Sequence, residues 1–199
     1  TPKMAVKHPN WKMGKKISID SSTMMNKIYE VIEARNIFNF KLKQIRILIH
    51  PKSYIHAIVT FNNGLSKILI HDTDMKIPIA NSIYEKNRMF LNNLNLNIEK
   101  LNTLNFKPVD IRRFPSLKIL KKISNNSTLL DTILVSANDE LVDLFLKKKI
   151  KFVEIVKKLN KILKLKEFNK YKHQKPKNID EIIQLSHVVR LKTRSLCIG

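Results

Sequence analysis

The chain has 199 residues, 43% of them hydrophobic, which is enough to bury a core and typical of one domain or two small ones. Its formal charge of +22 would fit a nucleic-acid-binding protein, but the lysines are spread over the whole chain among many Asn and Ile residues, which indicates a compositional bias rather than a binding stripe. One cysteine, Cys197, excludes a disulfide framework or a cysteine metal site within the chain, and no run of about eighteen apolar residues predicts a membrane span.

The N-terminal segment predicts a loop at about 7–16, with the sequence His8-Pro9-Asn10-Trp11-Lys12-Met13-Gly14 at its centre. Trp11 is the only tryptophan, and a large ring in a loop is either a satellite of the core or a lid over a ligand, because binding groups concentrate on loops. The chain starts abruptly at Thr1-Pro2 without a targeting peptide, so we expect a mature or clipped piece of a longer protein.

A helix is expected after this loop. Apolar residues from Met24 to Phe38 recur at roughly helical spacing, and the polar residues 20–22 are good caps, so the helix should open beside Ser21. A helix start offers unpaired N–H donors and the positive end of the macrodipole, which favour a bound anion such as phosphate.

Side chains near this helix start predict how the anion would be held. Ser21, Asn26 and Lys27 are the expected clamp. Lys27 and Glu30 are three residues apart and therefore share one face of the helix. They are either an anion ligand beside a cation ligand or an ordinary surface ion pair.

The next elements predict a small sheet. Residues 45–49 and 54–61 fit strands, and Asn63-Gly64 before a third strand at 65–70 predicts a hairpin with a type I′ turn. We expect the helix of the first third to pack on this mainly antiparallel sheet.

The rest of the chain predicts a connecting segment and helices. Asn- and Leu-rich sequence with prolines at its end indicates a connection at 85–110. Helices are predicted at 116–123, at 129–148 as one or two, and at 152–166, and Asn178-x-x-Glu181 is a capping-box-like start for a final one. The three glycines form no G-x-G-x-x-G loop, so the expected class is α+β with a C-terminal helical bundle and no Rossmann domain.

Several motifs together resemble the 1-deoxy-D-xylulose 5-phosphate reductoisomerase family. The flap and following helix of that family are similar to His8-Pro9-Asn10-Trp11, Met13-Gly14, Lys16-Ile17-Ser18, Asp20-Ser21, Thr23-Met24-Met25-Asn26-Lys27 and Glu33-Ala34-Arg35. Further matches are Ile49-His50-Pro51, Ser53, Ile55-His56, Asp74-Met75 and Pro78-Ile79-Ala80. The resemblance is dense over the first 80 or so residues and looser at Asn138-Asp139-Glu140.

The resemblance implies an activity and a domain division. Members rearrange 1-deoxy-D-xylulose 5-phosphate and reduce the product with NADPH to 2-C-methyl-D-erythritol 4-phosphate, an isoprenoid precursor, with Mg²⁺ or Mn²⁺ holding the substrate oxygens. Residues 1–84 would be the C-terminal part of the catalytic domain with its flap, 85–110 a linker, and 111–199 the helical bundle.

The resemblance also assigns site residues. Glu30 would be a metal ligand, since carboxylate oxygens suit Mg²⁺ and Mn²⁺. The expected catalytic residues are Glu30, Lys27, His8 and Trp11; substrate would be bound by these and by Ser21, Asn26, Ser53 and His56; NADPH would lie near Gly14, Met13 and Met75. Lys12 and Thr73 depart from the residues that many members carry at these positions.

Partners and location follow from the same resemblance. In the family the NADPH domain and the other two metal carboxylates lie upstream of the position of Thr1, so we expect this chain alone neither to bind NADPH nor to turn over. Expected partners are a phosphorylated sugar, phosphonate hydroxamate inhibitors, a second copy in a homodimer and the upstream half, without a membrane. The AT-rich codon habit suggests a plastid-type organelle (apicoplast). The alternative is a basic nucleic-acid or ribosome-associated protein of an AT-rich organelle genome.

Overall fold

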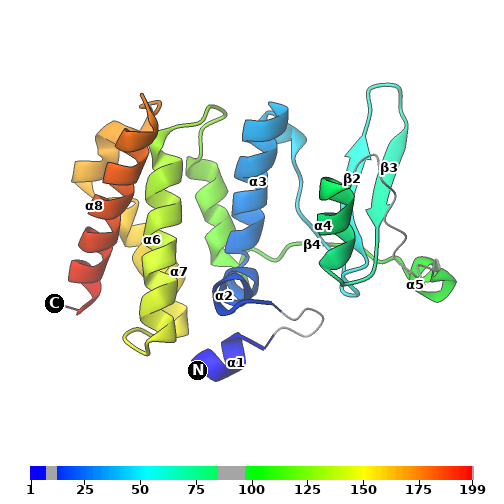
Figure 1. The fold of residues 1–199 in the computed structure, drawn as a ribbon, viewed down its shortest axis with the longest axis horizontal. Helices are drawn as coiled ribbons and strands as arrows, with labels where there is room; N and C mark the ends of the chain where they lie inside the picture. Colours follow the sequence, from blue (N-terminus) through cyan, green and yellow to red (C-terminus); the bar gives the residue numbers. More distant parts are fainter. Residues whose placement is uncertain (8–12, 85–96, 199) are drawn as a thin grey trace. The chain divides into compact units, whose positions relative to one another are not determined.

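The computed structural model describes residues 1–7, 13–84 and 97–198, which form two compact units (Figure 1). The helical unit contains residues 1–7, 13–47 and 110–198, and the hairpin unit contains residues 48–84 and 97–109. The loop expected at about 7–16 lies mostly outside the described residues.

The helical unit is built from α-helices and short 3-10 helices. Its elements are α1 (Pro2–Ala5), α2 (Lys15–Thr23), α3 (Met25–Phe38), η1 (Leu42–Gln44), η2 (Pro115–Lys122), α6 (Leu129–Leu146), α7 (Phe152–Ile162), η3 (Lys166–Lys172) and α8 (Ile179–Ile198).

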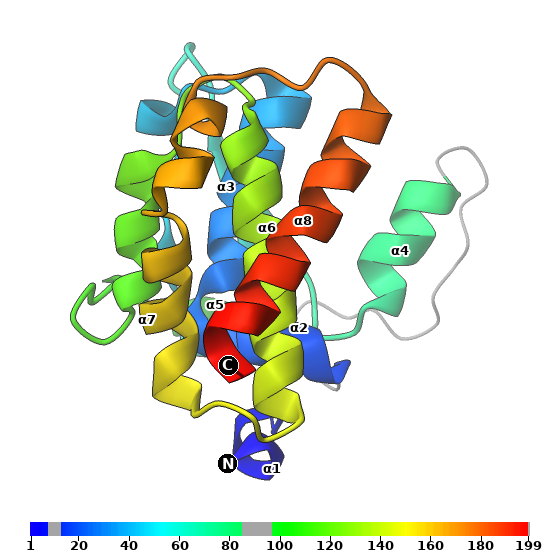
Figure 2. The same ribbon diagram turned by 90° about the vertical axis from the view of Figure 1, so that its left-hand side faces the viewer.

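Helix α6 lies at the centre of this unit, between α7 and α8 in the second view (Figure 2). It is buried on most sides, and Ile133, Ala137 and Leu141 are fully buried. The neighbours that cover its apolar side chains are α2, α7, α8 and η3. The core of the unit is therefore organised around α6.

Helices α2 and α3 are separated by a single left-handed residue. Met24 has φ 61° and ψ 17°, and its N–H donates to the carbonyl of Ser21 at 3.1 Å. The prediction that one helix opens beside Ser21 is therefore wrong, because residues 20–22 lie inside the last turn of α2 and α3 begins at Met25. Buried Ile19 and Ile28 fix both helices to the core.

The C-terminal helices follow the predictions, with differences in the type of the first and the length of the last of the three described next. Residues 115–122 form a 3-10 helix that starts at Pro115, the predicted 129–148 helix is the single helix α6, and the predicted 152–166 helix ends at Ile162. The predicted start of α8 is confirmed, because the N–H of Glu181 donates to Oδ1 of Asn178 at 2.8 Å.

The hairpin unit holds the sheet. Its elements are β1 (Leu48–Ile49), β2 (Ile55–Thr60), β3 (Ser66–Ile70), α4 (Lys76–Ile83), α5 (Ile98–Asn102) and β4 (Lys107–Pro108). β2 pairs with β3 and β1 with β4, both antiparallel. The register places Ile58 opposite Ile68 and Thr60 opposite Ser66.

The turn between β2 and β3 differs from the predicted type I′. Gly64 donates to the carbonyl of Phe61 at 3.0 Å, and Phe61 donates to the carbonyl of Leu65 at 2.8 Å. Gly64 has φ 85°, whereas Asn63 is not among the residues with positive φ. The loop therefore has three residues, with the left-handed position at the glycine, as in a type I turn followed by a G1 bulge.

Residues 97–110 are not only a connection. Asn97 caps α5 by accepting from the N–H of Lys100 at 2.9 Å, and Lys107 pairs with Ile49. The described part of the predicted linker thus belongs to the hairpin unit, and the rest of it, 85–96, lies outside the described residues. A compact unit is not the same as a domain, so these units do not test the predicted domain bounds. The division of the chain at 84 and 110 stays a prediction.

The expected fold class is confirmed: helices are combined with a small antiparallel sheet, and no Rossmann domain occurs in the described part of the chain. Inside its own unit, α3 packs against α2 and η2. In the described residues, none of the helices combines the length and the apolar character that a membrane crossing requires.

Candidate functional site

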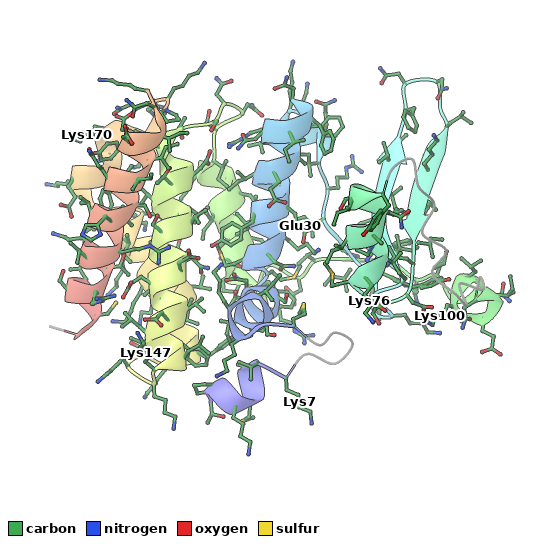
Figure 3. All side chains as sticks on the ribbon, viewed as in Figure 1. Lys7, Glu30, Lys76, Lys100, Lys147 and Lys170 are labelled. Atoms are coloured by element: carbon green, nitrogen blue, oxygen red, sulfur yellow. The ribbon has the colours of Figure 1, made fainter. Side chains whose placement is uncertain are left out.

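Three of the predicted site residues meet in the first turns of α3. Nζ of Lys27 contacts both carboxylate oxygens of Glu30, at 2.7 and 2.8 Å, and Nδ2 of Asn26 contacts Oε1 of Glu30 at 3.3 Å. The side chains of Lys27 and Glu30 are 36% and 50% exposed, so a ligand can reach both from solvent. Glu30 is labelled on α3 in Figure 3. The amine and the carboxylate thus share one face, as their spacing predicts.

Ser21 lies on the neighbouring helix. It belongs to the last turn of α2, whereas Asn26 and Lys27 belong to the first turn of α3. The start of α3 offers backbone donors and the positive end of its dipole, which are the groups the sequence analysis placed beside Ser21. The three predicted clamp residues therefore come from two helices rather than from one.

Gly14 and Met13 stand at the opposite end of α2. Gly14 is its N-cap residue, with φ −61°, and its carbonyl accepts from the N–H of Ser18 at 3.1 Å and from the hydroxyl of Ser18 at 3.0 Å. A Cβ at Gly14 would meet nothing within 4 Å. Neither φ nor packing in the described chain therefore requires a glycine at this position, which leaves room there for a ligand.

The remaining predicted residues that are described belong to the hairpin unit. Ser53 has a positive φ of 51°, and its N–H donates to the carbonyl of His50 at 3.0 Å. Nε2 of His56 lies 2.9 Å from the carbonyl oxygen of His71, and the two imidazole rings stack with centroids 3.6 Å apart. Met75 precedes α4 and is 49% exposed.

His71 had no expected function, and its stacking on His56 was missed because His56 lies on β2 whereas His71 directly follows β3. His8 and Trp11, the two predicted flap side chains, lie outside the described residues. Their assigned functions stay predictions.

A divalent metal would find one carboxylate in this part of the chain. Among the described residues, no three His, Cys, Asp or Glu side chains come close enough together to hold a metal ion. Glu30 offers oxygen donors of the type that Mg²⁺ prefers, but Lys27 holds both oxygens. Glu30 therefore fits a metal as one ligand of a site completed elsewhere, provided that Lys27 turns to another anion.

Sequence reasoning missed a buried polar cluster behind this site. Asp20 is 2% exposed, and its carboxylate accepts from Nδ2 of Asn138 and from Nζ of Lys16, both at 2.7 Å. Lys16 also contacts Asp139, which binds Arg190. The partners are more than a hundred positions apart, so no local pattern could have paired Asp20 with Asn138.

Lysines lie at both ends of the helical unit. In the helical unit, Lys147 follows the end of α6 while Lys170 lies in η3 at the other end of the unit (Figure 3). Their separation agrees with the compositional origin of the charge rather than with a stripe that tracks a nucleic acid.

Comparisons with known proteins identify the family. The family model described as DXP reductoisomerase C-terminal domain matches residues 70–192, and that described as 1-deoxy-D-xylulose 5-phosphate reductoisomerase C-terminal domain matches residues 1–38. The 1-deoxy-D-xylulose 5-phosphate reductoisomerase of Pelagibacter ubique is 59% identical over 98% of this chain and 50% of its own length. That of Francisella tularensis subsp. novicida is 40% identical over 96% of this chain and 48% of its own.

Solved structures agree. A DOX-P reductoisomerase in complex with NADPH, fosmidomycin and magnesium superposes with a TM-score of 0.90 at 33% identity, over 98% of this chain and 49% of that one. The reductoisomerase from Zymomonas mobilis in complex with NADPH gives 0.83 at 33% identity, over 99% of this chain and 49% of that one. The chain thus spans about half the length of the relatives it matches. It belongs to the DXP reductoisomerase C-terminal domain family.

Proposed function

We propose that this chain is the C-terminal half of an enzyme that converts 1-deoxy-D-xylulose 5-phosphate to 2-C-methyl-D-erythritol 4-phosphate with NADPH and Mg²⁺ or Mn²⁺. The observation that carries the proposal is the cluster of Asn26, Lys27 and Glu30 at the start of α3. The cluster lies in a chain of which 98% aligns with a reductoisomerase at 59% identity. The nucleic-acid alternative has no comparable support.

The cluster suggests how Lys27 and Glu30 divide their work. In the chain alone the ammonium neutralises the carboxylate. A substrate phosphate would be a competing anion for Lys27, because charge-assisted bonds to phosphate are strong. Moving Lys27 to the phosphate frees both oxygens of Glu30 for a metal. When bound, a divalent metal supplies Lewis-acid polarisation of the substrate carbonyl.

Ser21 and Asn26 complete the proposed phosphate clamp, and Ser53 and His56 are also proposed to bind the substrate. Met13, Gly14 and Met75 are proposed to border NADPH. His8 and Trp11 would close over the substrate and exclude water from it. A phosphonate hydroxamate would occupy the phosphate clamp and the metal together. The location in a plastid-type organelle stays a prediction.

The hairpin supports the proposed assembly. Ile58 and Ile68 are opposite each other on one face and are 42% and 45% exposed, while Val59 and Leu69 on the other face are 42% and 56% exposed. A sheet with apolar residues on both faces needs cover on both sides. We propose that the upstream half and a second copy in a homodimer supply that cover.

A chimeric enzyme tests the function. Residues 1–199 are joined behind the N-terminal half of the Pelagibacter ubique relative, and NADPH oxidation is followed with 1-deoxy-D-xylulose 5-phosphate and Mg²⁺. We expect turnover from the chimeric enzyme and none from the 199-residue chain alone. A folded chimeric enzyme that binds NADPH but neither turns over nor binds fosmidomycin would contradict the proposal.

A further inference from the structure

A polar network with a buried centre joins four helices of the helical unit. It consists of Lys16 and Asp20 of α2, Asn138 and Asp139 of α6, and Arg190 of α8, and Nζ of Lys16 also lies 5.3 Å from the ring centroid of Tyr29 of α3. Its centre is the carboxylate of Asp20, which receives Asn138 on one oxygen and Lys16 on the other. Asn138 is 0% exposed and Asp20 is 2% exposed.

The network contacts both helices that carry the proposed clamp. Asp20 directly precedes Ser21, and Tyr29 directly precedes Glu30. The hydroxyl of Tyr29 is buried, and burial together with the charges of Asp20 and Asp139 raises the pKa of this phenol, which keeps it neutral. Each anchor therefore lies one residue from a side chain proposed to touch the ligand.

Replacing the Asn138 contact would be difficult. A carboxylate removed from water must receive hydrogen bonds from the protein. A buried oxygen without a donor has lost its hydration without compensation, which destabilises the fold. Nδ2 of Asn138 reaches Asp20 across 118 positions of sequence, from the rigid centre of α6. A second long-range bond acts on the same turn, since the hydroxyl of Ser116 donates to the carbonyl of Thr23.

We propose that Asn138 is a positioning residue, which acts through Asp20 to hold the last turn of α2 so that Ser21 meets the phosphate group bound at the start of α3. This inference rests on the proposed function for the identity of the ligand. Asn138 itself does not touch the ligand. The network would thus connect the centre of the helical core to the phosphate clamp.

The test compares two deletions of a buried polar group from α6. Asn138→Ala removes the bond to Asp20, whereas the control Ser136→Ala removes the 2.8 Å bond between Ser136 and Ser186 of α8 and leaves α2 untouched. Hydrogen exchange of the 199-residue chain should accelerate about tenfold at residues 21–27 in Asn138→Ala and less than about twofold there in the control. Equal exchange at 21–27 in both variants would overturn the proposal.

Ligand binding supplies the second readout. Asn138→Ala should weaken fosmidomycin binding to the chimeric enzyme about tenfold, and should have little further effect once Ser21 has been replaced by alanine, because coupled residues are not additive. Additive effects of Asn138→Ala and Ser21→Ala, or unchanged affinity despite faster exchange, would also overturn it. A wild-type chimeric enzyme that turns over while the two variants behave alike would refute the positioning and leave the proposed function standing. If Asn138→Ala exchanges faster at residues 21–27 but the wild-type chimeric enzyme does not turn over, the link from Asn138 to the last turn of α2 would stand and the proposed function would be refuted.

Discussion

The helical unit and the hairpin unit differ in how far they bury their apolar side chains. In the helical unit, Ile133 and Leu141 of α6 and Leu159 of α7 are buried to 1% exposure or less. In the described residues of the hairpin unit, Tyr54 is the only buried hydrophobic side chain, and Leu65 and Leu69 are more than half exposed. Helices can cover one another within a single chain, whereas a two-stranded sheet leaves both of its faces open.

The helical unit therefore covers its own apolar residues, whereas the hairpin unit needs a partner to cover them. The buried residues of the helical unit should determine the stability of the chain by itself. The apolar residues of the hairpin should matter only after assembly.

The largest effect is expected at a buried ion pair of the helical unit. Arg35 is 3% exposed, pairs with Asp131 and donates to the carbonyl of Ser124 at 2.7 Å. Arg35→Met should lower the free energy of unfolding by about 3–5 kcal/mol, because it leaves a largely buried carboxylate without its partner. Urea unfolding of the 199-residue chain measures this. The exposed Arg46→Met is the control and should change stability by less than about 0.5 kcal/mol.

The next prediction compares the two units directly. Leu141→Ala should cost about 2–5 kcal/mol, because it opens a cavity beside α6. Ile58→Ala, which truncates a side chain that is already 42% exposed, should cost less than about 1 kcal/mol in the same urea titration. Similar losses in the two variants would show that the hairpin has a core of its own and would remove the basis of the distinction.

A substitution at Glu30 of α3 should lower the activity without lowering the stability of the fold. Glu30→Gln in the chimeric enzyme should lower kcat about a hundredfold or more, because an amide is a poor metal ligand, while the half-exposed side chain contributes little to folding. The exposed neighbour Glu33→Gln should leave kcat within about twofold. Turnover near the wild-type rate in Glu30→Gln would mean that Glu30 does not bind the metal.

The hairpin faces should control association. Ile68→Asp should weaken dimerisation of the chimeric enzyme about tenfold or more, since a carboxylate would be buried in an apolar contact. The melting temperature of the 199-residue chain should change little. Sedimentation velocity across a concentration series gives the dimer constant. An unchanged constant would place the dimer contact away from this face of the sheet.

The smallest effect is expected at a helix end. Asn178→Ala removes the acceptor for the N–H of Glu181 and should cost about 1 kcal/mol, whereas Asn178→Ser should retain most of the cap. Thermal unfolding of the 199-residue chain distinguishes these variants. A loss that is as large for serine as for alanine would show that the side-chain cap is not the source of the stability.

Local patterns predicted much of this fold. Asn63-Gly64 located the hairpin and Asn178-x-x-Glu181 the start of α8, because both signals depend on residues close in sequence. The details that depend on distant residues were not predictable. The sequence contains no sign that Asn138 would bind Asp20, or that the Met24 break would place Ser21 in a helix of its own.

The site was predictable to a similar degree. Lys27 and Glu30 meet because helical spacing requires it. The stacking of His56 on His71 depends on the strand register, which is fixed only when the turn and the bulge near Ile55 are known. Which residues share a helix face can thus be predicted from sequence, and which residues meet across elements cannot.

The left-handed Met24 determines which side chains can converge at all. In one unbroken helix, consecutive residues turn by about 100°, so that Ser21 and Lys27, six positions apart, would point about 120° apart around the axis. A single residue with φ 61° interrupts that regular rotation, so the direction of Ser21 relative to Lys27 is set by Met24 and not by their spacing. A helical conformation at Met24 would turn Ser21 away from its present direction relative to Lys27, and would thus alter the proposed clamp without changing any of its side chains.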